Sequence, residues 1–505
     1  MPDPLSTMGS RRRPAAARFE SPAWLLGLLA LWLLATLGMR PLLLPDEGRY
    51  ANVAREMLSG GMLVPTLNGL PFFHKPPLFY WLDMAAMQLF GLNAFAARIG
   101  AMLGGWLMGA SLFFALRRWH GPRVAATALL VLATCPLFFV SAQYANHDML
   151  VAGLITAAVL ALLRAVEQPP QVQPGWLMAG AALCALAMLA KGLIGVVLPA
   201  LVLGPWLLVQ GRWRQLLGLL HPLGLLVFAL VAAPWFVAVQ AKFPGFYDYF
   251  FMEQHFRRFA QATFNNVYPF WFFMAVLPAL TLPWSLWLPR ALRTAWAGPG
   301  ARPGLYLWWV IAVVGFFSIP SSKLVGYVLP ALAPWCVLLA LALAHTRKRL
   351  LYALVAGSAL ACVAIVGGLA WQAPKSNRAV ALALAERITA LDRVVMVDDY
   401  FYDVPFYARL QQPVTIASNW GDPGLPQHDN WRKELFDAAR FDPALGRAVL
   451  RPLDRLDALL CGAAGTVWFV LRPGEAPRLA ALPGVTRVMG FQGTELWRAP
   501  AHACP

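Results

Sequence analysis

About eleven apolar runs, each close to the length needed to cross a hydrocarbon core of about 30 Å, decide what this chain can fold into. Of its 505 residues, 59% are hydrophobic and 13% are charged, which excludes a soluble globular enzyme. We expect an α-helical polytopic membrane protein with about 11 to 13 transmembrane helices. The runs lie near residues 22–40, 97–117, 124–142, 149–165, 176–190, 193–210, 216–240, 269–289, 305–319, 325–343 and 350–371.

The basic residues favour one orientation of these runs in the membrane. The formal net charge is +17, and short basic clusters stand between apolar runs, for example Arg117-Arg118 and Arg347-Lys348-Arg349. Such clusters are typical of cytoplasmic loops, so the charge gives no reason to expect nucleic acid as a partner. With the N-terminus inside and the first run retained as a helix, the C-terminal segment lies outside. This topology makes residues 76–92 an interfacial or re-entrant helix of the first outer loop.

The composition changes near residue 373, where charges return and apolar runs shorten. Strand-like stretches at 394–397, 414–417 and 467–471 alternate with helical and turn-rich sequence. We therefore predict two domains, a membrane domain over 1–372 and a small α/β domain over 373–505. Four of the six cysteines lie inside apolar runs; Cys461 and Cys504 are the pair that an outer location would allow to form a disulfide.

Ionisable residues of both signs gather on the predicted outer side, which the positive-inside rule does not explain. Charges near a bilayer are costly unless they pair or serve a site, so this one-sided gathering is a functional-site hypothesis. The residues are Asp46, Glu47, Lys75, His147, Asp148, Lys191, Glu253, His255, Arg257, Arg258 and Lys323.

Three short motifs give this hypothesis its chemistry, and each also has an ordinary structural interpretation. Asp46 and Glu47 follow Pro45 and can start a helix, but two acids also suit a catalytic base beside a substrate or metal ligand. Lys75 precedes two prolines, whose stiff backbone can present its ammonium to a phosphate or to lipid headgroups. Asp148 begins an apolar run, where it serves as a helix cap or as a second cavity acid.

The remaining charged positions fit an anion site or the membrane interface. Lys191 and Lys323 at span ends are typical of interfacial lysines. His255 and Arg258 stand three residues apart, which on a helix places a metal ligand beside an anion clamp.

Taken together, these segments resemble the bacterial lipid A aminoarabinose transferases, which belong with the protein O-mannosyltransferases among the GT-C glycosyltransferases. The resemblance covers roughly residues 20 to 370, and the first hundred residues are its most specific part. Its motifs are Asp46 to Met57, Asn68-Gly69, Lys75-Pro76-Pro77-Leu78, Tyr80-Trp81, Phe90-Gly91, Arg98, Asp148, Lys191-Gly192, His255 to Phe259, and Ser322-Lys323 with Tyr327 and Pro330.

The resemblance implies an enzyme of the bacterial inner membrane that moves a sugar from a polyprenyl phosphate, such as undecaprenyl phosphate, to lipid A or another acceptor at the periplasmic face. It implies Asp46 as the catalytic carboxylate, Asp148 as a second cavity acid, and Lys75 with Arg258 as the clamp on the donor phosphate. We also predict Glu47 as catalytic, and we expect a monomer among membrane lipids. Further predicted donor-binding residues are Arg49, Arg257, Lys191, Lys323 and Tyr327.

The expected chemistry is a single displacement with inversion. A departing polyprenyl phosphate is an anion that needs cations rather than a general acid. Asp46 is the general base for a hydroxyl acceptor, or an orienting group if the acceptor is a phosphate. In zinc-bound relatives the residue before the lysine is acidic and pairs with a histidine. Here it is His74, which makes a divalent ion (zinc, magnesium or manganese) on His74 and His255 a further expectation.

Two alternatives stay open at this point. Within the enzyme class, the donor motifs allow transfer of mannose or another hexose to a protein or glycan. Outside it, charges in an outer cavity also line transporters and lipid-sugar flippases. The one-sided charge and the appended outer domain favour the enzyme.

Overall fold

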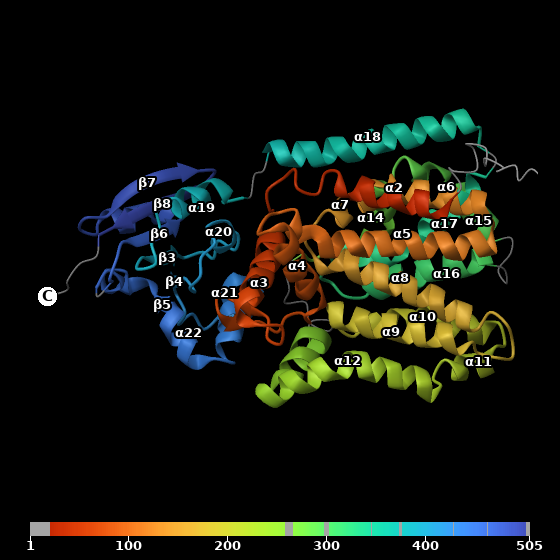
Figure 1. The fold of residues 1–505 in the computed structure, drawn as a ribbon, viewed down its shortest axis with the longest axis horizontal. Coiled ribbons are helices and arrows are strands. Elements are labelled where there is room, and N and C mark those ends of the chain that lie inside the picture. The colour runs from red at the N-terminus through yellow and green to blue at the C-terminus, as the bar shows by residue number, and fades with distance from the viewer. Residues whose placement is uncertain are drawn as a thin grey trace, which may run out of the picture.

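The computed structural model describes residues 21–257, 266–296, 302–344, 346–372, 376–427, 429–461 and 463–500, with only the backbone at 255–257. A long bundle of roughly parallel helices ends in a layer of shorter elements, and the C-terminal domain lies beyond that layer (Figure 1). The predicted helical membrane domain with a small C-terminal α/β domain is therefore confirmed.

Each of the predicted apolar runs contains helix in the described residues, but not always one straight helix. Six helices are long and apolar enough to cross a membrane: Ala96–Trp119 including α5 (Ile99–Trp119), α8 (His147–Ala165), α9 (Pro174–Lys191), α12 (Pro222–Lys242), Val325–Ala342 including α17 (Leu332–Ala342), and α18 (Lys348–Gln372).

The other runs are bent or shorter than the prediction of about eleven full spans requires. Helices α6 (Pro122–Ala133) and α7 (Pro136–Ala142) meet at 67°, and α14 (Phe272–Leu280) meets the segment Trp284–Trp296, which contains α15 (Leu288–Trp296), at 110°. A proline follows each break, and proline cannot continue a preceding helix. Helices α2 (Pro22–Leu34), α10 (Ile194–Val209) and α16 (Arg302–Ser318) are the shorter ones.

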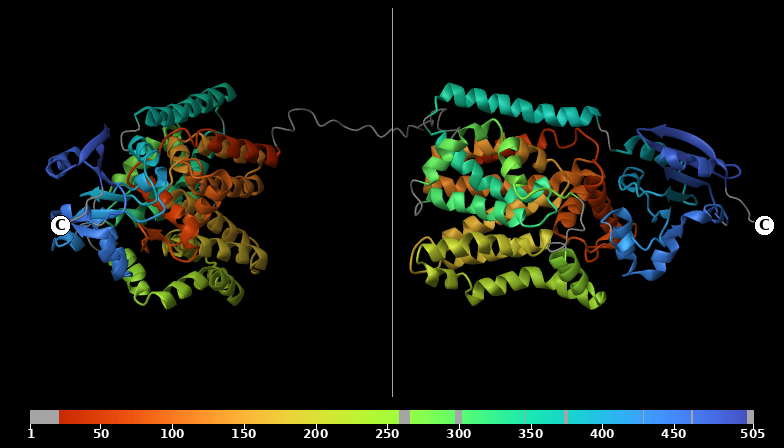
Figure 2. Two further views of the ribbon diagram at one scale, coloured as in Figure 1. Left: turned by 60° about the vertical axis from the view of Figure 1, so that its left-hand side comes forward. Right: turned by 180° about the vertical axis from the view of Figure 1, so that it is seen from behind.

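Helix α8 is the centre of the bundle, and α18 lies on its edge. Of the apolar window of α8, 83% is buried, against 17% for α18. Gly104 of α5 and Gly153 of α8 let the two backbones touch, since a Cβ added at Gly153 would lie 2.0 Å from the Gly104 carbonyl oxygen. Both views in Figure 2 place α18 along the outside of the bundle. The central helix thus holds its first turn, with His147 and Asp148, at a fixed position.

A layer of short elements covers one end of the bundle. It consists of α3 (Asp46–Gly60), strands β1 (Thr66–Leu67) and β2 (Leu70–Pro71), and α4 (Leu78–Phe90), which is the helix predicted within 76–92. Asn68 and Gly69 form the hairpin turn with φ of 56° and 76°, the conformation for which an Asn-Gly pair is suited. The Glu56 carboxylate accepts hydrogen bonds from both turn amides at 2.9 Å.

The C-terminal domain is a six-stranded sheet of order β5-β4-β3-β6-β8-β7. Strands β3 to β6 are parallel, and β7 and β8 form an antiparallel hairpin at one edge. Strands β3, β4 and β6 confirm the three predicted strands. The elements are α19 (Arg378–Ala385), β3 (Arg393–Val397), α20 (Val404–Tyr407), β4 (Thr415–Ser418), α21 (Trp431–Ala439), α22 (Pro443–Val449), β5 (Leu450–Pro452), β6 (Val467–Leu471), α23 (Ala476–Ala480), β7 (Thr486–Phe491) and β8 (Thr494–Ala499).

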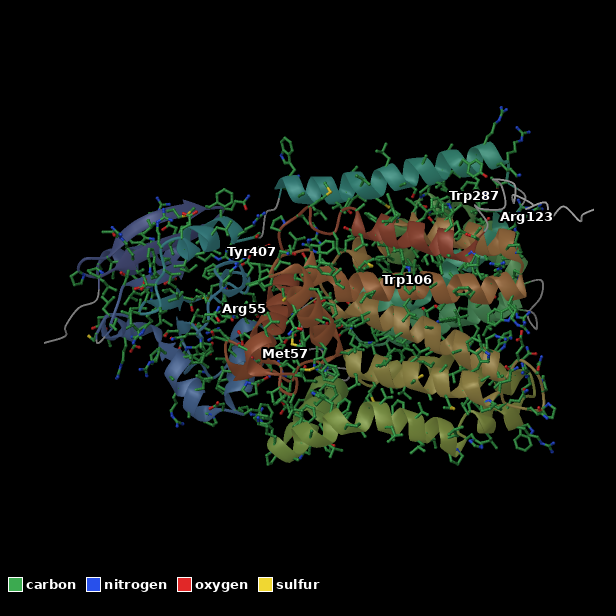
Figure 3. All side chains as sticks on the ribbon, viewed as in Figure 1. Arg55, Met57, Trp106, Arg123, Trp287 and Tyr407 are labelled. Carbon is green, nitrogen blue, oxygen red and sulfur yellow. The ribbon has the colours of Figure 1, made fainter. Side chains whose placement is uncertain are left out.

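The end layer and the C-terminal domain are joined by hydrogen bonds between fixed backbone and side-chain groups. Asn68 makes a reciprocal pair with the Val414 backbone at 2.8 and 2.9 Å, and the Leu42 amide donates to the Tyr407 hydroxyl at 2.8 Å. Figure 3 shows Tyr407 at this junction and Arg123 at the opposite end of the bundle. Cys461 is disulfide-bonded, and Cys504 lies outside the described residues.

Candidate active site

Asp46, in the first turn of α3, is held from two sides and stays partly open. Its Oδ1 atom forms an ion pair with Arg49 one turn later, and its Oδ2 atom accepts a hydrogen bond from the Asn146 side chain at 3.2 Å. The side chain of Asp46 is 26% exposed. A fixed carboxylate with an accessible edge is what a catalytic base or an orienting group requires.

Glu47 has a different position from the one predicted for a catalytic residue. It is fully buried between the guanidinium groups of Arg40 and Arg98, and its oxygens also accept from the amides of Leu43 and Ala145 at 2.9 and 2.8 Å. Burial would raise the pKa of this carboxyl, but the two arginines lower it to about 2. Because these four groups enclose the Glu47 carboxylate, the structure does not present it beside Asp46 as a second reacting acid.

Asp148, in the first turn of α8, and Lys191, the last residue of α9, form an ion pair. Asn146 caps α8 by accepting from the Asp148 amide at 2.9 Å, and the same residue contacts Asp46, which links the two acids. Lys191 Nζ lies 4.7 Å from the ring centre of Tyr327. A Cβ added at Gly326 would lie 1.9 Å from Asp148 Oδ2, so only glycine allows this carboxylate its position.

His147 lies at the centre of the predicted cations. It is fully buried, packs edge to ring on Tyr50 and Tyr80 at 4.5 and 5.0 Å, and interacts electrostatically with Lys75, Lys191 and Arg49. Neither ring nitrogen of His147 nor the Tyr80 hydroxyl has a hydrogen-bond partner in the described structure. Buried polar atoms are nearly always satisfied, so these unsatisfied atoms, enclosed by the rings of Tyr50, Phe79 and Tyr80, are an unusual polar spot in the packed interior.

Other predicted donor-binding residues occupy different positions. Lys323 is buried, which lowers its pKa, and its ammonium donates to the backbone carbonyls of Tyr268, Pro320 and Ser321. It therefore ties two loops together instead of presenting a free charge to phosphate. Arg258 and the side chains of His255 and Arg257 lie outside the described residues.

Of the two predicted metal ligands, His74 and His255, only His74 has a described side chain. His74 is buried and stacks on Phe72, with ring centres 4.5 Å apart. Among the described side chains, three or more His, Cys, Asp or Glu residues nowhere meet as a metal ligand set. The His74–His255 site stays a prediction.

A cavity of about 660 Å³ extends from Asp46 into the C-terminal domain. Asp46, Arg49, Tyr402 and Glu434 are neighbouring residues of its lining. Arg49 pairs with both Asp46 and Glu434, and the Tyr402 hydroxyl donates to Glu434 at 2.6 Å. Arg49 was predicted as a donor-phosphate ligand; both of its terminal nitrogens instead organise carboxylates.

Glu434 is a site residue that the sequence analysis did not identify. Glu434 is 385 positions from Arg49 in the chain and looks like an ordinary glutamate of an amphipathic helix. Burial raises the pKa of its carboxyl, and the Arg49 guanidinium opposes that rise. Tyr402 follows a predicted strand and is, with Asp398, Asp399 and Tyr400, a candidate acceptor contact in the sequence, but no local signal indicates its hydrogen bond to Glu434.

The fold and this site define a class, the polytopic membrane proteins with GT-C architecture. The crystal structure of ArnT from Cupriavidus metallidurans bound to undecaprenyl phosphate matches 97% of this chain and 100% of its own, with a TM-score of 0.84 and 26% identity. The archaeal oligosaccharyltransferase AglB from Archaeoglobus fulgidus shares the fold at a TM-score of 0.53, with 14% identity over 90% of this chain and 70% of its own.

Within that class, the resemblance found in the sequence is confirmed: the chain is homologous to the undecaprenyl phosphate-α-4-amino-4-deoxy-L-arabinose arabinosyl transferases. It is 37% identical to the one from Erwinia tasmaniensis, over 62% of this chain and 57% of the relative, and 35% identical to one from Pseudomonas aeruginosa, over 66% and 61%. It thus spans about three fifths of the length of these relatives. Residues 74–237 match the dolichyl-phosphate-mannose-protein mannosyltransferase family model.

Proposed function

We propose that this chain transfers a sugar, aminoarabinose or a close analogue, from undecaprenyl phosphate to lipid A at the outer face of a bacterial inner membrane. The observation that carries the proposal is the position of Asp46: it opens to a cavity on one side and is tied through Asn146 to the Asp148–Lys191 pair on the other. The names of the homologues support the same donor.

The cations near His147 suit the leaving group. Lys75 and Lys191 both interact electrostatically with His147, and their positive charges would stabilise the negative charge of a departing phosphate. Preorganised positive charge in a site with little water stabilises such a transition state strongly. Asp46 takes the proton of a hydroxyl acceptor or orients a phosphate acceptor, and attack opposite the leaving group inverts the sugar carbon.

The sidedness of the bundle supports an outer active site. Basic residues such as Arg117, Arg118 and Arg123 stand at the end opposite the C-terminal domain (Figure 3). The positive-inside rule assigns that end to the cytoplasm, which puts the site and the C-terminal domain in the periplasm. A divalent ion held by His74 and His255, if bound, would add positive charge at the donor phosphate.

The test is a transfer assay with purified protein, undecaprenyl phosphate-linked aminoarabinose and lipid A. We compare the wild type with Lys75→Ala and with the matched control Lys242→Ala, a lysine at the C-terminal end of α12. The proposal expects glycosylated lipid A from the wild type and the control, and a loss of about a hundredfold or more with Lys75→Ala.

The other outcomes reassign the function. Donor consumption that depends on Lys75 but yields no modified lipid A would keep the transferase and replace the acceptor. Movement of the donor across vesicle membranes without cleavage would identify a flippase.

A further inference from the structure

A second charged cluster lies at the end of the bundle opposite the C-terminal domain. Arg118 is in the last turn of α5, Arg164 is in the last turn of α8, and Arg302 is the first residue of α16. All three side chains meet at Glu167, just beyond α8. In Figure 1 this is the right-hand end of the bundle. The cluster is therefore separate from the candidate active site.

The arginines of this cluster carry more positive charge than its acid can neutralise. Glu167 accepts hydrogen bonds from Arg118 and Arg302 at 3.1 Å each, accepts one from Trp119 at 2.9 Å, and forms an ion pair with Arg164. Arg164 also interacts electrostatically with Arg118 and Arg302, whose like charges repel it. Among the described residues, no other acid forms an ion pair with these arginines. Three guanidinium groups around one carboxylate leave two positive charges unbalanced.

Two of the arginines keep hydrogen-bond donors for a ligand. The side chains of Arg118 and Arg302 are 50% and 42% exposed, against 16% for Arg164. Arg118 contacts Glu167 through Nε and Arg302 contacts it through one terminal nitrogen, whereas a guanidinium has five N–H donors. The planar guanidinium group matches the geometry of phosphate oxygens. The cluster can therefore bind phosphate without releasing Glu167.

The start of α16 adds to the attraction for an anion. Its first turn contains Arg302 and no acidic residue, although carboxylates are the side chains that complement a helix N-terminus. The amide groups of a first turn have no partners within their own helix. The positive end of the helix dipole and the exposed guanidinium groups therefore act at the same place.

Aromatic and apolar side chains next to the cluster are suited to lipid. The Arg164 guanidinium lies over the ring of Trp176, 5.3 Å from its centre. Trp176 is 43% exposed, and Phe114, which precedes Arg118 by one turn on the same face of α5, is 53% exposed. Tryptophan is enriched at the boundary between membrane and water. A lipid would contact the arginines with its head group and this apolar surface with its chains, whereas a soluble anion would contact the arginines alone.

We propose that the cluster of Arg118, Arg164 and Arg302 around Glu167 binds an anionic phospholipid whose head group carries two phosphates, the chemistry of cardiolipin. The two unbalanced positive charges match two phosphates, and basic pockets between membrane helices bind such head groups. The bound lipid holds the ends of α5, α8 and α16 together. The inference is independent of sugar transfer and rests on the proposed function only for the leaflet, which is the cytoplasmic one.

The test is a titration of the purified protein in neutral detergent, with bound lipid counted by native mass spectrometry. The probes are cardiolipin with two phosphates, phosphatidylglycerol with one, phosphatidylcholine with no net charge, and inorganic pyrophosphate. The wild type is compared with Arg118→Gln/Arg302→Gln. The matched control is Arg290→Gln/Arg293→Gln, which removes two exposed arginines from α15 at the same end of the bundle.

We expect cardiolipin to bind the wild type and the control alike, about tenfold or more tightly than phosphatidylglycerol. Its Kd should rise about thirtyfold in Arg118→Gln/Arg302→Gln, roughly fivefold for each arginine. Phosphatidylcholine should bind every variant equally weakly, and pyrophosphate in excess should not displace cardiolipin because it has no acyl chains. The double variant should stay folded, since half-exposed ion pairs contribute little to stability.

Glu167→Gln distinguishes lipid binding from a purely structural role of the cluster. The substitution removes the carboxylate that competes with phosphate for the arginines, so the Kd for cardiolipin should fall about fivefold. Without lipid, the thermal midpoint of this variant should lie below that of the wild type, because the three guanidinium groups then repel one another. Added cardiolipin should raise the midpoint by more than it does in the wild type.

Four results would overturn the inference. Unchanged cardiolipin affinity in Arg118→Gln/Arg302→Gln would exclude the cluster as the site, and an equal loss in Arg290→Gln/Arg293→Gln would show a general attraction to basic surface. Displacement of cardiolipin by pyrophosphate would identify a soluble phosphate compound as the ligand. Weaker cardiolipin binding by folded Glu167→Gln would mean that the acid builds the site instead of competing for it. The last two results do not depend on whether the double variant folds.

Discussion

Two ion clusters begin at adjacent residues of α3 and differ in how completely their groups are satisfied. Around Glu47, two arginines and two backbone amides meet one carboxylate, and all three charged side chains are buried. Around Asp46, one arginine is shared between two carboxylates, and the cluster faces a cavity. A saturated cluster fixes the fold, whereas one with accessible edges can bind and react.

The difference also shows why burial does not identify a catalytic residue here. Glu47 fastens the loop before α3 to Arg98, directly before α5, and to the Ala145 amide before α8. That positions Asp46 without contacting any substrate. Function should therefore follow Asp46 and stability should follow Glu47, and each prediction below tests this separation.

Asp46→Asn should give the largest effect. The amide keeps the size of the side chain and one hydrogen bond to its neighbours but cannot act as a base, so we expect kcat/KM for transfer to fall about a thousandfold. The thermal midpoint of the purified protein should stay close to that of the wild type, because the side chain is partly exposed. Asp454→Asn, an exposed acid of the C-terminal domain, is the control. Loss of folded protein with Asp46→Asn would contradict the comparison.

Glu47→Gln should have the opposite signature. Removing one charge leaves Arg40 and Arg98 buried with no carboxylate between them, which costs about 3 to 5 kcal/mol of stability. We expect a large drop in the thermal midpoint and, for the protein that remains folded, nearly normal KM values for both substrates. A stable variant with a thousandfold lower kcat would instead make Glu47 catalytic.

Asp83 allows the effect of burial to be tested apart from that of ion pairing. It is a buried acid of α4, and among the described residues it has no arginine partner. It accepts one hydrogen bond, from the Gly100 amide at 2.9 Å, and its other oxygen is unsatisfied. Burial raises the pKa of this carboxyl well above its usual range. The folded state then binds the extra proton, so stability falls as pH rises above the unfolded value of about 3.9.

The sign for Glu47 is reversed. Its folded pKa of about 2 lies below the unfolded value, so its contribution is present above about pH 4.3 and is lost as the pH falls towards 2. Because burial raises the pKa of Asp83, Asp83→Asn should flatten the decline of the free energy of unfolding as the pH rises above about 3.9, by at most about 1.4 kcal/mol per pH unit. An unchanged pH profile in this variant would mean that Asp83 is ionised in the folded protein.

Sequence patterns could predict the apolar helices and three of the six strands, because these elements show a local pattern of hydrophobic residues. Strand β5 has three residues and includes a proline, and β7 is largely exposed, so neither carries a strong pattern. Pro136 and Pro283 are prolines at which a bend can be expected. The bends were not predicted, because each apolar run is long enough to be taken for one straight helix.

The site was predictable where its residues lie close to membrane helix ends. Asp46, Asp148, Lys191 and Lys75 do converge, through Asn146 and His147. The role of Glu434 could not be predicted from the sequence. Its contact with Arg49 depends on how the two domains pack together, and no sequence motif or hydrophobic periodicity indicates that contact. Glu47 does not join Asp46 at the cavity, because the guanidinium groups of Arg40 and Arg98 hold its carboxylate in the interior.

Glu434→Gln tests the ion cluster around Asp46, and of the substitutions discussed here it should have the smallest effect. Glu434 touches Arg49 and Tyr402 but not the expected reacting atoms, so it is a positioning residue for Asp46. We expect kcat to fall about tenfold while the KM values for donor and acceptor stay within about twofold. Glu475→Gln, a carboxylate of the same domain in an exposed ion pair, is the control.

The pH profile distinguishes positioning from a merely structural role. Glu434 and Asp46 repel each other across the shared Arg49. Because burial raises the pKa of the Glu434 carboxyl, the wild type loses this charge as the pH falls, whereas Glu434→Gln has no such group to titrate; the acidic limb of the pH profile of kcat should therefore move to lower pH. Tyr402→Phe keeps the charge and should leave that limb in place with a smaller loss of rate. A rate loss without any shift of the acidic limb would mean that Glu434 only holds the two domains together, and that Asp46 keeps its orientation without the C-terminal domain.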